Sequence, residues 1–213
     1  MRVHGYYAIL DAAPALLGDG PALEAQAGRL LAGGPCCLQL RAKSAGARDV
    51  LGAARRLLPL CRQRGVPFCV NDRLDVALAA GADAVHLGQD DLPLADAVRL
   101  RAQVGRPQLV VGFSTHNREQ ALAAAAGGAD YIGFGPIFPT ASKLNPDPVV
   151  GLDALAAVSR SVPVPVMAIG GVALASVAAV AAAGAAAVAL ISAVAGAPDP
   201  AAAGRQVAAA FGA

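Results

Sequence analysis

Short apolar runs alternate with alanine-rich stretches along the whole chain. Each run ends in glycine or in polar residues, and the alternation occurs eight times. This is the pattern of a (β/α)8, or TIM, barrel, in which parallel strands form an inner barrel surrounded by helices. The predicted strand ends are Tyr6–Leu10, Cys37–Lys43, Cys69–Arg73, Val85–Asp91, Val110–His116, Ile132–Ser142, Met167–Gly171 and Leu190–Ser192. We therefore expect an α/β fold, a TIM barrel, with residues 1–213 as a single domain.

The stretches between these runs predict helices. They are rich in alanine, and several end at glycine, which accepts the left-handed conformation that follows a helix. The expected helices are Pro21–Ala32, Ala47–Arg64, Leu74–Ala80, Leu94–Gln103, Arg118–Ala126, Leu152–Ser159, Leu174–Ala183 and Pro200–Ala210.

Residues 161–198 carry no charge, so length alone would allow a membrane-spanning helix. However, Pro163 and Pro165 interrupt the start of this segment, and Gly184 divides the rest into a helical half and an apolar strand. We interpret it as the seventh strand, the seventh helix and the eighth strand, with the strands buried on both sides. No membrane partner is expected.

Composition limits the other function classes. The chain has 213 residues, of which 56% are hydrophobic and 15% charged, so a large core is possible. A net charge of +2 without a basic run, and the absence of tryptophan, argue against nucleic-acid binding. The N-terminus lacks the apolar region of a signal peptide. Cys36, Cys37, Cys61 and Cys69 form no CxxC pair and are read as reduced thiols, so we expect a cytoplasmic protein.

Acidic residues follow two neighbouring predicted strands. Asp72 closes the third strand, and Asp90 and Asp91 follow the fourth. Asp72 and Asp91 can therefore face one pocket. Carboxylates beside cations, without a histidine, suit Mg²⁺, which takes oxygen ligands and keeps waters for a phosphate. An equally open alternative is that Asp72 pairs with Arg73 or caps the next helix, and that Asp90 or Asp91 caps the helix after Pro93.

Cations follow the second and sixth strands. Gln39, Arg41 and Lys43 alternate with apolar residues, so their side chains are expected on one side of a strand. Such groups directed at a barrel axis are unfavourable unless they meet an anion or one another. An anionic ligand is the better explanation, and a solvated strand end is the alternative. Lys143, after the sixth strand, could reach the same anion. With the acids, these cations describe a diphosphate–Mg²⁺ site.

A second phosphate site is expected after the last two strands. Gly171 follows the seventh strand, and Ile191 and Ser192 end the eighth. Backbone amides at these places commonly bind a phosphate in this barrel class, because glycine lets the main chain approach and a helix N-terminus adds its dipole. A tight turn that requires glycine is the alternative.

The three histidines are too scattered to form a zinc site. His86 stands within the fourth strand and is expected to be an oriented core or rim residue. His116 follows Ser114 at the end of the fifth strand, where it could touch a ligand.

Six segments of the chain resemble a known family when taken together. They are Gln39–Lys43, Asn71–Arg73, His86–Pro93, Ser114–His116, Gly135–Thr140 and Ala168–Gly171. In this order they resemble the thiamine phosphate synthases, over most of the chain, and the combination is highly specific. The resemblance implies a transferase on a TIM barrel. It would join 4-amino-2-methyl-5-(diphosphooxymethyl)pyrimidine to 4-methyl-5-(2-phosphooxyethyl)thiazole and release thiamine phosphate and diphosphate.

The resemblance also assigns residues to each ligand. The positions that match contacts to the pyrimidine diphosphate are Gln39, Arg41, Lys43, Asn71, Ser114 and Lys143. Those that match contacts to the thiazole phosphate are Thr140, Ala141, Ser142, Gly171, Ile191 and Ser192. Asp72 and Asp91 match the Mg²⁺ ligands. The chain departs from the family's pattern at Ala42 and Ser44, where acidic or amide residues are frequent, and at Ser142, where threonine is usual.

The implied reaction does not require an activated side-chain nucleophile. Diphosphate leaves readily only when its developing charge is neutralised, which Mg²⁺, Arg41, Lys43 and Lys143 can do. The aminopyrimidine can stabilise the methylene left behind, and the thiazole nitrogen then attacks it. We expect Lys43, Lys143 and Ser114 to be the catalytic residues, with Ser114 as a positioning group rather than a nucleophile.

Three other functions are alternatives to this one. A thiazole tautomerase on the same barrel would not require a diphosphate–Mg²⁺ site, so Asp72, Asp91 and Lys143 argue against it. A sugar-phosphate isomerase or epimerase would share the site at Gly171 but has no evident use for Asp72 and its neighbours. The third is a non-catalytic protein that binds thiamine precursors. Turnover with both substrates would separate the synthase from all three.

Overall fold

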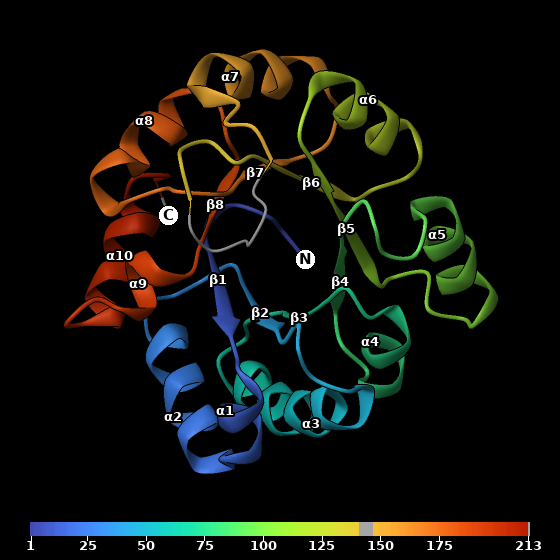
Figure 1. Cartoon of the computed structure of the whole chain (residues 1–213). Helices are drawn as coiled ribbons and strands as arrows, with labels where there is room; N and C mark the ends of the chain where they lie inside the picture. The colour runs from blue at the N-terminus through green and yellow to red at the C-terminus, as the bar shows by residue number, and fades with distance from the viewer. Residues whose placement is uncertain (141–146, 213) are drawn as a thin grey trace.

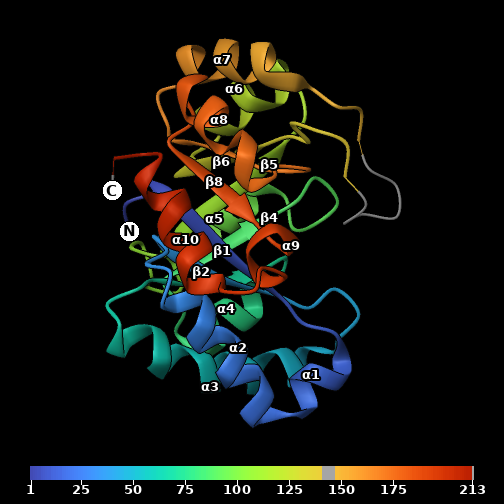
Figure 2. The ribbon, with the colours of Figure 1, turned by 90° about the vertical axis from the view of Figure 1, so that its left-hand side faces the viewer.

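Eight parallel strands form a closed barrel in the order of the sequence, which confirms the predicted TIM-barrel fold. The computed structural model describes residues 1–140 and 147–212. The helices form a ring around the barrel, as seen along its axis in Figure 1. Figure 2 shows both chain termini on one side of the barrel and the short helices α1 and α9 on the other.

The strands fall where the apolar runs predicted them. Their bounds are β1 Gly5–Asp11, β2 Cys37–Arg41, β3 Phe68–Asn71, β4 Ala84–Leu87, β5 Val110–Thr115, β6 Tyr131–Phe134, β7 Val166–Ala168 and β8 Ala187–Leu190. Pairing of β1 with β8, from Gly5 opposite Ala187 to Ala8 opposite Leu190, closes the barrel. Polar residues after each strand therefore meet at one rim of the barrel.

The helices also agree closely with the prediction. Their bounds are α1 Pro14–Gly18, α2 Gly20–Leu31, α3 Ala47–Gln63, α4 Leu74–Ala80, α5 Leu94–Gln103, α6 Arg118–Ala126, α7 Gly151–Ser161, η1 Leu174–Ser176, α8 Val177–Ala182, α9 Ser192–Ala195 and α10 Pro200–Ala209. The expected helix over 174–183 begins as the 3₁₀ turn η1 before it continues as α8. The short helices α1 and α9 were not predicted, because so few residues show no helical period.

Side chains of the strands divide into two buried layers. Tyr6, Ala8 and Leu10 of β1 pack in the layer beneath the helices. Tyr7 and Ile9 of the same strand belong to a separate cluster, which we call the inner cluster; its other buried members are Val3, Cys37, Cys69, Ala84, Tyr131, Met167, Ala187 and Ala189. The alternation follows from the two-residue period of a strand. The four cysteines are free, as expected, although Cys36 is only partly buried.

The uncharged segment 161–198 contributes the last residue of α7 and then β7, η1, α8, β8 and α9. Across the described parts of the chain, no helix combines the length and the apolar character needed to cross a membrane. This agrees with the interpretation of the segment as barrel strands and a helix.

Candidate active site

The expected site residues that the structure describes come together at the rim formed by the carboxyl ends of the strands. Gln39 and Arg41 belong to β2 and Asn71 ends β3, while Ser114 lies near the end of β5. The rim positions just beyond the strands are Lys43, Asp72, Asp91, Thr140, Gly171, Ile191 and Ser192. Ala141, Ser142 and Lys143 lie outside the described residues.

Asp72 is the centre of a small charged cluster. Its Oδ2 lies 3.3 Å from Nζ of Lys43, and its carboxylate also interacts with that of Asp91. Burial raises the pKa of Asp72, and the charge of Asp91 raises it further, while Lys43 opposes both effects. Asp72 also has a φ of 63°, the one positive value at a non-glycine position among the described residues. The backbone at Asp72 thus has a conformation that is uncommon for a non-glycine residue and that often occurs at functional sites.

The alternative that these acids pair with Arg73 or cap the following helices is wrong. Arg73 pairs with Asp75 at 2.6 Å, rather than with Asp72. The N-caps of α4 and α5 are Arg73 and Pro93, and neither helix start has a side-chain cap. Oδ2 of Asp91 instead accepts a hydrogen bond from the backbone N–H of Gly88, at 2.7 Å. This contact fixes Asp91 in place beside Asp72.

The pair Asp72 and Asp91 fits a Mg²⁺ ion that shares its remaining ligands with a substrate. The two carboxylates disfavour each other's charge, and a cation between them would relieve this repulsion. Among the described residues, no group of three or more histidine, cysteine or acidic side chains is placed to hold a metal. Mg²⁺ usually needs no such group, because one or two carboxylates with substrate phosphates and waters suffice.

The polar residues of β2 and its following loop reach different depths. Gln39 is buried, with 2% of its surface exposed, and its amide donates to the hydroxyl of Tyr7 at 3.2 Å. Nη1 of Arg41 lies 2.6 Å from Oδ1 of Asp11, its neighbour across the sheet. The side chain of Lys43 is half exposed. Arg41 and Lys43 line the same cavity of about 290 Å³, and Gln39 is not part of its lining. That all three face one anion stays a prediction.

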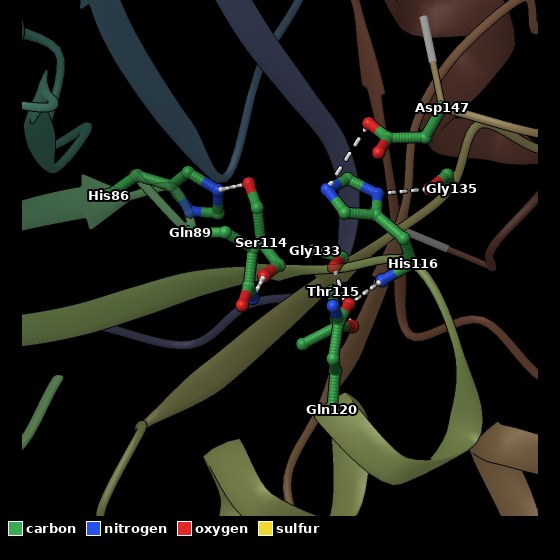
Figure 3. Close-up of polar contacts among 9 residues, drawn as sticks. All are labelled: His86, Gln89, Ser114, Thr115, His116, Gln120, Gly133, Gly135 and Asp147. Atoms are coloured by element: carbon green, nitrogen blue, oxygen red, sulfur yellow. Dashed lines mark hydrogen bonds and ion pairs between the residues drawn. The ribbon is translucent and has the colours of Figure 1, made fainter. Parts of the chain in front are cut away.

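Ser114 is held from two sides. Its Oγ lies 2.9 Å from Nε2 of His86, and its carbonyl accepts a hydrogen bond from the amide of Gln89 at 2.5 Å, as Figure 3 shows. Nδ1 of His86 faces the hydroxyl of Tyr131 at 3.0 Å, not a carboxylate. His86 is thus the oriented core residue that its place in β4 predicted.

Both ring nitrogens of His116 contact other residues of the protein. Nδ1 lies 2.6 Å from the carbonyl oxygen of Gly135, and Nε2 lies 3.4 Å from Oδ2 of Asp147. Figure 3 shows the ring with its two nitrogens directed at these two partners. The ring therefore joins the end of β5 to the loop that precedes α7.

The turn after β7 requires glycine. Gly171 has a φ of 67°, and a side chain there would overlap the carbonyl oxygens of Phe138 and Pro139. The backbone N–H of Phe138 donates to the carbonyl of Gly170 at 3.0 Å, so the loop after β6 rests on this turn. After β8, Ile191 is the N-cap of α9 and Ser192 is its first residue. Gly171, Ile191 and Ser192 thus follow neighbouring strands at one part of the rim.

Sequence reasoning missed three residues of this region. Asp11 ends β1 beside Arg41, one position beyond the predicted strand. Tyr7 and Tyr131 belong to the inner cluster and carry hydroxyl groups between Gln39 and His86. A signal existed, because Tyr7 lies at even spacing from Ile9, but tyrosine in a strand usually indicates packing alone.

Comparison with known proteins places the chain in a family. A family model described as thiamine monophosphate synthase matches residues 6–194. The chain belongs to this family. It is 50% identical to the thiamine-phosphate synthase of Anaeromyxobacter dehalogenans over 210 residues, which cover 99% of the chain and 89% of that protein. The solved structure of thiamine phosphate pyrophosphorylase from Pyrococcus furiosus matches with a TM-score of 0.84 and 34% identity, over 99% of the chain and 96% of the other.

More distant barrels share only the fold. The structure of a 3-hexulose-6-phosphate synthase matches with a TM-score of 0.69 at 21% identity, covering 97% of the chain and 99% of that structure. A likeness at this level says nothing about substrates. It lends no support to a sugar-phosphate isomerase or epimerase.

Proposed function

We propose that the rim of this barrel joins an aminopyrimidine methyl diphosphate to a thiazole phosphate, with thiamine phosphate and diphosphate as the products. The chain is a transferase of the thiamine monophosphate synthase family, which supports this reaction. The observation that carries the proposal is the cluster of Lys43, Asp72 and Asp91 beside Arg41. A diphosphate needs both cations and a bound metal to leave as a stable anion.

Asp72 and Asp91 would hold Mg²⁺ through their carboxylate oxygens. When bound, Mg²⁺ supplies positive charge for the departing diphosphate. Lys43 now pairs with Asp72, at 3.3 Å, and its half-exposed side chain is free to move to a substrate oxygen. Arg41 lines the same cavity and offers a planar guanidinium, which binds phosphate oxygens in pairs. Lys143, which lies outside the described residues, would supply a further cation to the diphosphate.

The pyrimidine ring would lie between β2, β3 and β5. Asn71 and Ser114 place an amide and a hydroxyl group at or near the ends of β3 and β5, and Gln39 adds a buried amide from the middle of β2. These groups suit a ring with nitrogen atoms and an amino group. Ser114 and His86 resemble a nucleophile and base, but Nδ1 of His86 bonds to the Tyr131 hydroxyl instead of a carboxylate. Among the described residues, the partner of Nδ1 is thus a hydroxyl and not the carboxylate that stabilises an imidazolium in a catalytic triad. Ser114 serves to position the ring.

The thiazole phosphate would bind at the ends of β7 and β8. Gly171 brings its backbone close to the loop after β6, and Ile191 and Ser192 open α9. Free backbone amides at such a place suit a phosphate monoester. Thr140, with Ala141 and Ser142 next along the chain, would complete this pocket from the same loop.

A thiazole tautomerase is a weaker explanation. Its reaction has no diphosphate whose charge must be neutralised, so it does not explain the cluster of Lys43, Asp72 and Asp91. A sugar-phosphate isomerase would likewise have no departing diphosphate to use the lysine that pairs with one of the two adjacent carboxylates.

A turnover assay tests the proposal directly. The purified chain is incubated with both substrates and Mg²⁺, and thiamine phosphate and diphosphate are measured in parallel. We expect both products in equal amounts, and neither when one substrate is omitted. Tautomer conversion of a thiazole without the pyrimidine substrate would favour the rival function. Binding of both substrates without product would indicate a non-catalytic protein.

A further inference from the structure

A continuous chain of hydrogen bonds crosses the barrel interior beneath the active site. Nε2 of Gln39 donates to Oη of Tyr7 at 3.2 Å, and this oxygen lies 3.0 Å from Oη of Tyr131. Oη of Tyr131 lies 3.0 Å from Nδ1 of His86, whose Nε2 lies 2.9 Å from Oγ of Ser114. Figure 3 shows this last contact. The two residues at the ends of this hydrogen-bond chain, Gln39 and Ser114, are proposed contacts of the pyrimidine substrate.

The interior is shaped to hold these groups. Both tyrosines are fully buried, and His86 is 6% exposed. A side chain at Gly112 would overlap the ring of Tyr131, and one at Gly133 would lie 3.1 Å from the ring of His86. Polar groups in such surroundings are costly unless each one has a partner. An apolar interior would pack as well, so stability alone does not explain a polar chain here.

The hydrogen bonds of this chain have one direction. The amide nitrogen of Gln39 can only donate, so the Tyr7 oxygen accepts and its own hydrogen is available for Tyr131. Tyr131 then accepts from Tyr7 and donates to Nδ1 of His86. A neutral imidazole that accepts at Nδ1 carries its hydrogen on Nε2, which donates to Oγ of Ser114.

Neighbouring groups do not reverse this order. The sulfur of Cys69 lies beside both tyrosine hydroxyls and 3.9 Å from Nε2 of Gln39, and the Cys37 thiol adjoins Tyr7. The Cys69 thiol donates to the carbonyl oxygen of Val70 at 3.6 Å, and a sulfur atom is a weaker acceptor than a hydroxyl oxygen. Burial raises the pKa of Tyr7 and of Tyr131 well above the ordinary value, so both hydroxyls keep their hydrogens. Each member of the chain therefore passes one hydrogen bond toward Ser114.

We infer that Tyr7 and Tyr131 are positioning residues that set which end of the pyrimidine site donates and which accepts. Because Ser114 receives a hydrogen bond from His86, its own hydrogen points to the ligand as a donor. Gln39 uses an N–H on Tyr7 and keeps its carbonyl oxygen as an acceptor. A donor and an acceptor held across the site complement an aminopyrimidine, whose ring nitrogens accept and whose amino group donates. This last step rests on the proposed function; the state of His86 does not.

The protonated nitrogen of His86 is the direct test, and it needs no substrate. Nitrogen-15 NMR of the labelled protein distinguishes the two ring nitrogens, with assignment from a His86→Gln sample. At a pH of about 8, above the ordinary pKa of imidazole, we expect hydrogen on Nε2 and a bare Nδ1. In Tyr131→Phe, Nδ1 loses its donor, so both neutral forms should appear. Tyr7→Phe should have a smaller effect of the same kind, since the Tyr131 hydroxyl can then turn.

Tyr6→Phe is the matched control. Tyr6 is adjacent to Tyr7 and 1% exposed, but it packs in the layer beneath the helices, and its buried hydroxyl has no hydrogen-bond partner in the described structure. It should leave both the NMR signals of His86 and the kinetics unchanged. Hydrogen on Nδ1 in the wild-type protein, or on both nitrogens, would overturn the inference even if the tyrosine variants failed to fold.

Kinetics provide the second test. In Tyr131→Phe we expect KM for the pyrimidine diphosphate to rise about tenfold, the effect of one lost hydrogen bond near its upper limit. KM for the thiazole phosphate should be unchanged, which a general loss of structure would not allow. Equal changes in both KM values, or none, would overturn the positioning role. A wild-type protein that makes no product would refute the proposed function instead, and the NMR result would still decide the direction of the chain.

Discussion

Nζ of Lys43 lies 3.3 Å from Oδ2 of Asp72 at the rim of the barrel, although half of the lysine side chain is exposed. An exposed pair of this kind contributes little to stability. Its importance is electrostatic, because Lys43 is the cation that offsets the repulsion between Asp72 and Asp91. If Asp72 and Asp91 held Mg²⁺, the ion would supply that positive charge, and Lys43 would be available to an anionic substrate.

The first prediction concerns the two acids. Asp72→Asn and Asp91→Asn should each abolish Mg²⁺-dependent turnover, since an amide cannot supply the charge that holds the ion. Turnover is measured across a Mg²⁺ titration, and circular dichroism verifies the fold. Asp75→Asn is the control, because Asp75 lies three residues from Asp72 and forms its ion pair with Arg73 at the surface. Full activity of either variant at ordinary Mg²⁺ levels would remove that residue from the site.

The second prediction separates charge from structure at Lys43. Lys43→Ala should lower kcat on the order of a hundredfold, because one cation at the departing diphosphate is lost. The melting temperature should hardly change, since the side chain is half exposed. Lys43→Arg should recover part of the rate. Lys143→Ala should behave like Lys43→Ala, and a normal kcat in either alanine variant would exclude that lysine from catalysis.

The third prediction concerns Gly171. Gly171→Ala should raise KM for the thiazole phosphate and leave KM for the pyrimidine diphosphate nearly unchanged. The added methyl group would push against the carbonyl oxygens of Phe138 and Pro139 and displace the turn. Gly65→Ala is the control: Gly65 has a similar φ of 64°, but nothing lies within 4 Å of the added atom. It should cost about 1 kcal/mol of stability through backbone strain alone.

A selective effect on the pyrimidine diphosphate, with a normal KM for the thiazole phosphate, would show that the two pockets were assigned the wrong way round. Equal effects of Gly171→Ala and Gly65→Ala on stability, with no effect on either KM, would make Gly171 a residue of the fold only.

The sequence sufficed for the barrel because its period is carried by many residues at once. Eight apolar runs with helices between them predict one arrangement, a closed barrel of parallel strands. An error in assigning a single residue does not change that prediction. The helix over 174–183 shows the limit, since its 3₁₀ first turn depends on the local bond from Ser176 to Ala173. Such a bond leaves no repeating pattern.

The site was harder to predict where side chains meet across strands. The register of β1 and β2 places Asp11 opposite Arg41, and no pattern within either strand reveals a register. The chain from Gln39 to Ser114 likewise joins residues on β1, β2, β4, β5 and β6. A polar residue inside a strand, such as Gln39, can be recognised in the sequence. Its partners cannot, because they depend on which residues face it across the barrel.

The last prediction is mechanistic and depends on the arrangement around Ser114. Its partner His86 has a tyrosine hydroxyl, not a carboxylate, on its other nitrogen, so Ser114 is poorly activated as a nucleophile. If diphosphate leaves first, the barrier depends on how well the pyrimidine stabilises positive charge on its methylene carbon. Replacing the ring methyl group by trifluoromethyl, which withdraws electrons, should therefore slow turnover far more than it weakens binding.

Single-turnover rates and the dissociation constants of the two pyrimidines give this comparison. A rate ratio of about a hundred would correspond to about 2.7 kcal/mol in the barrier. Ser114→Ala should slow turnover much less than the trifluoromethyl group does, since it removes one positioning hydrogen bond. A covalent adduct on Ser114, trapped and identified by mass spectrometry, would contradict this mechanism. Comparable rates for both pyrimidines would instead indicate that the thiazole nitrogen attacks as the diphosphate leaves, because little positive charge would then collect on the carbon between them.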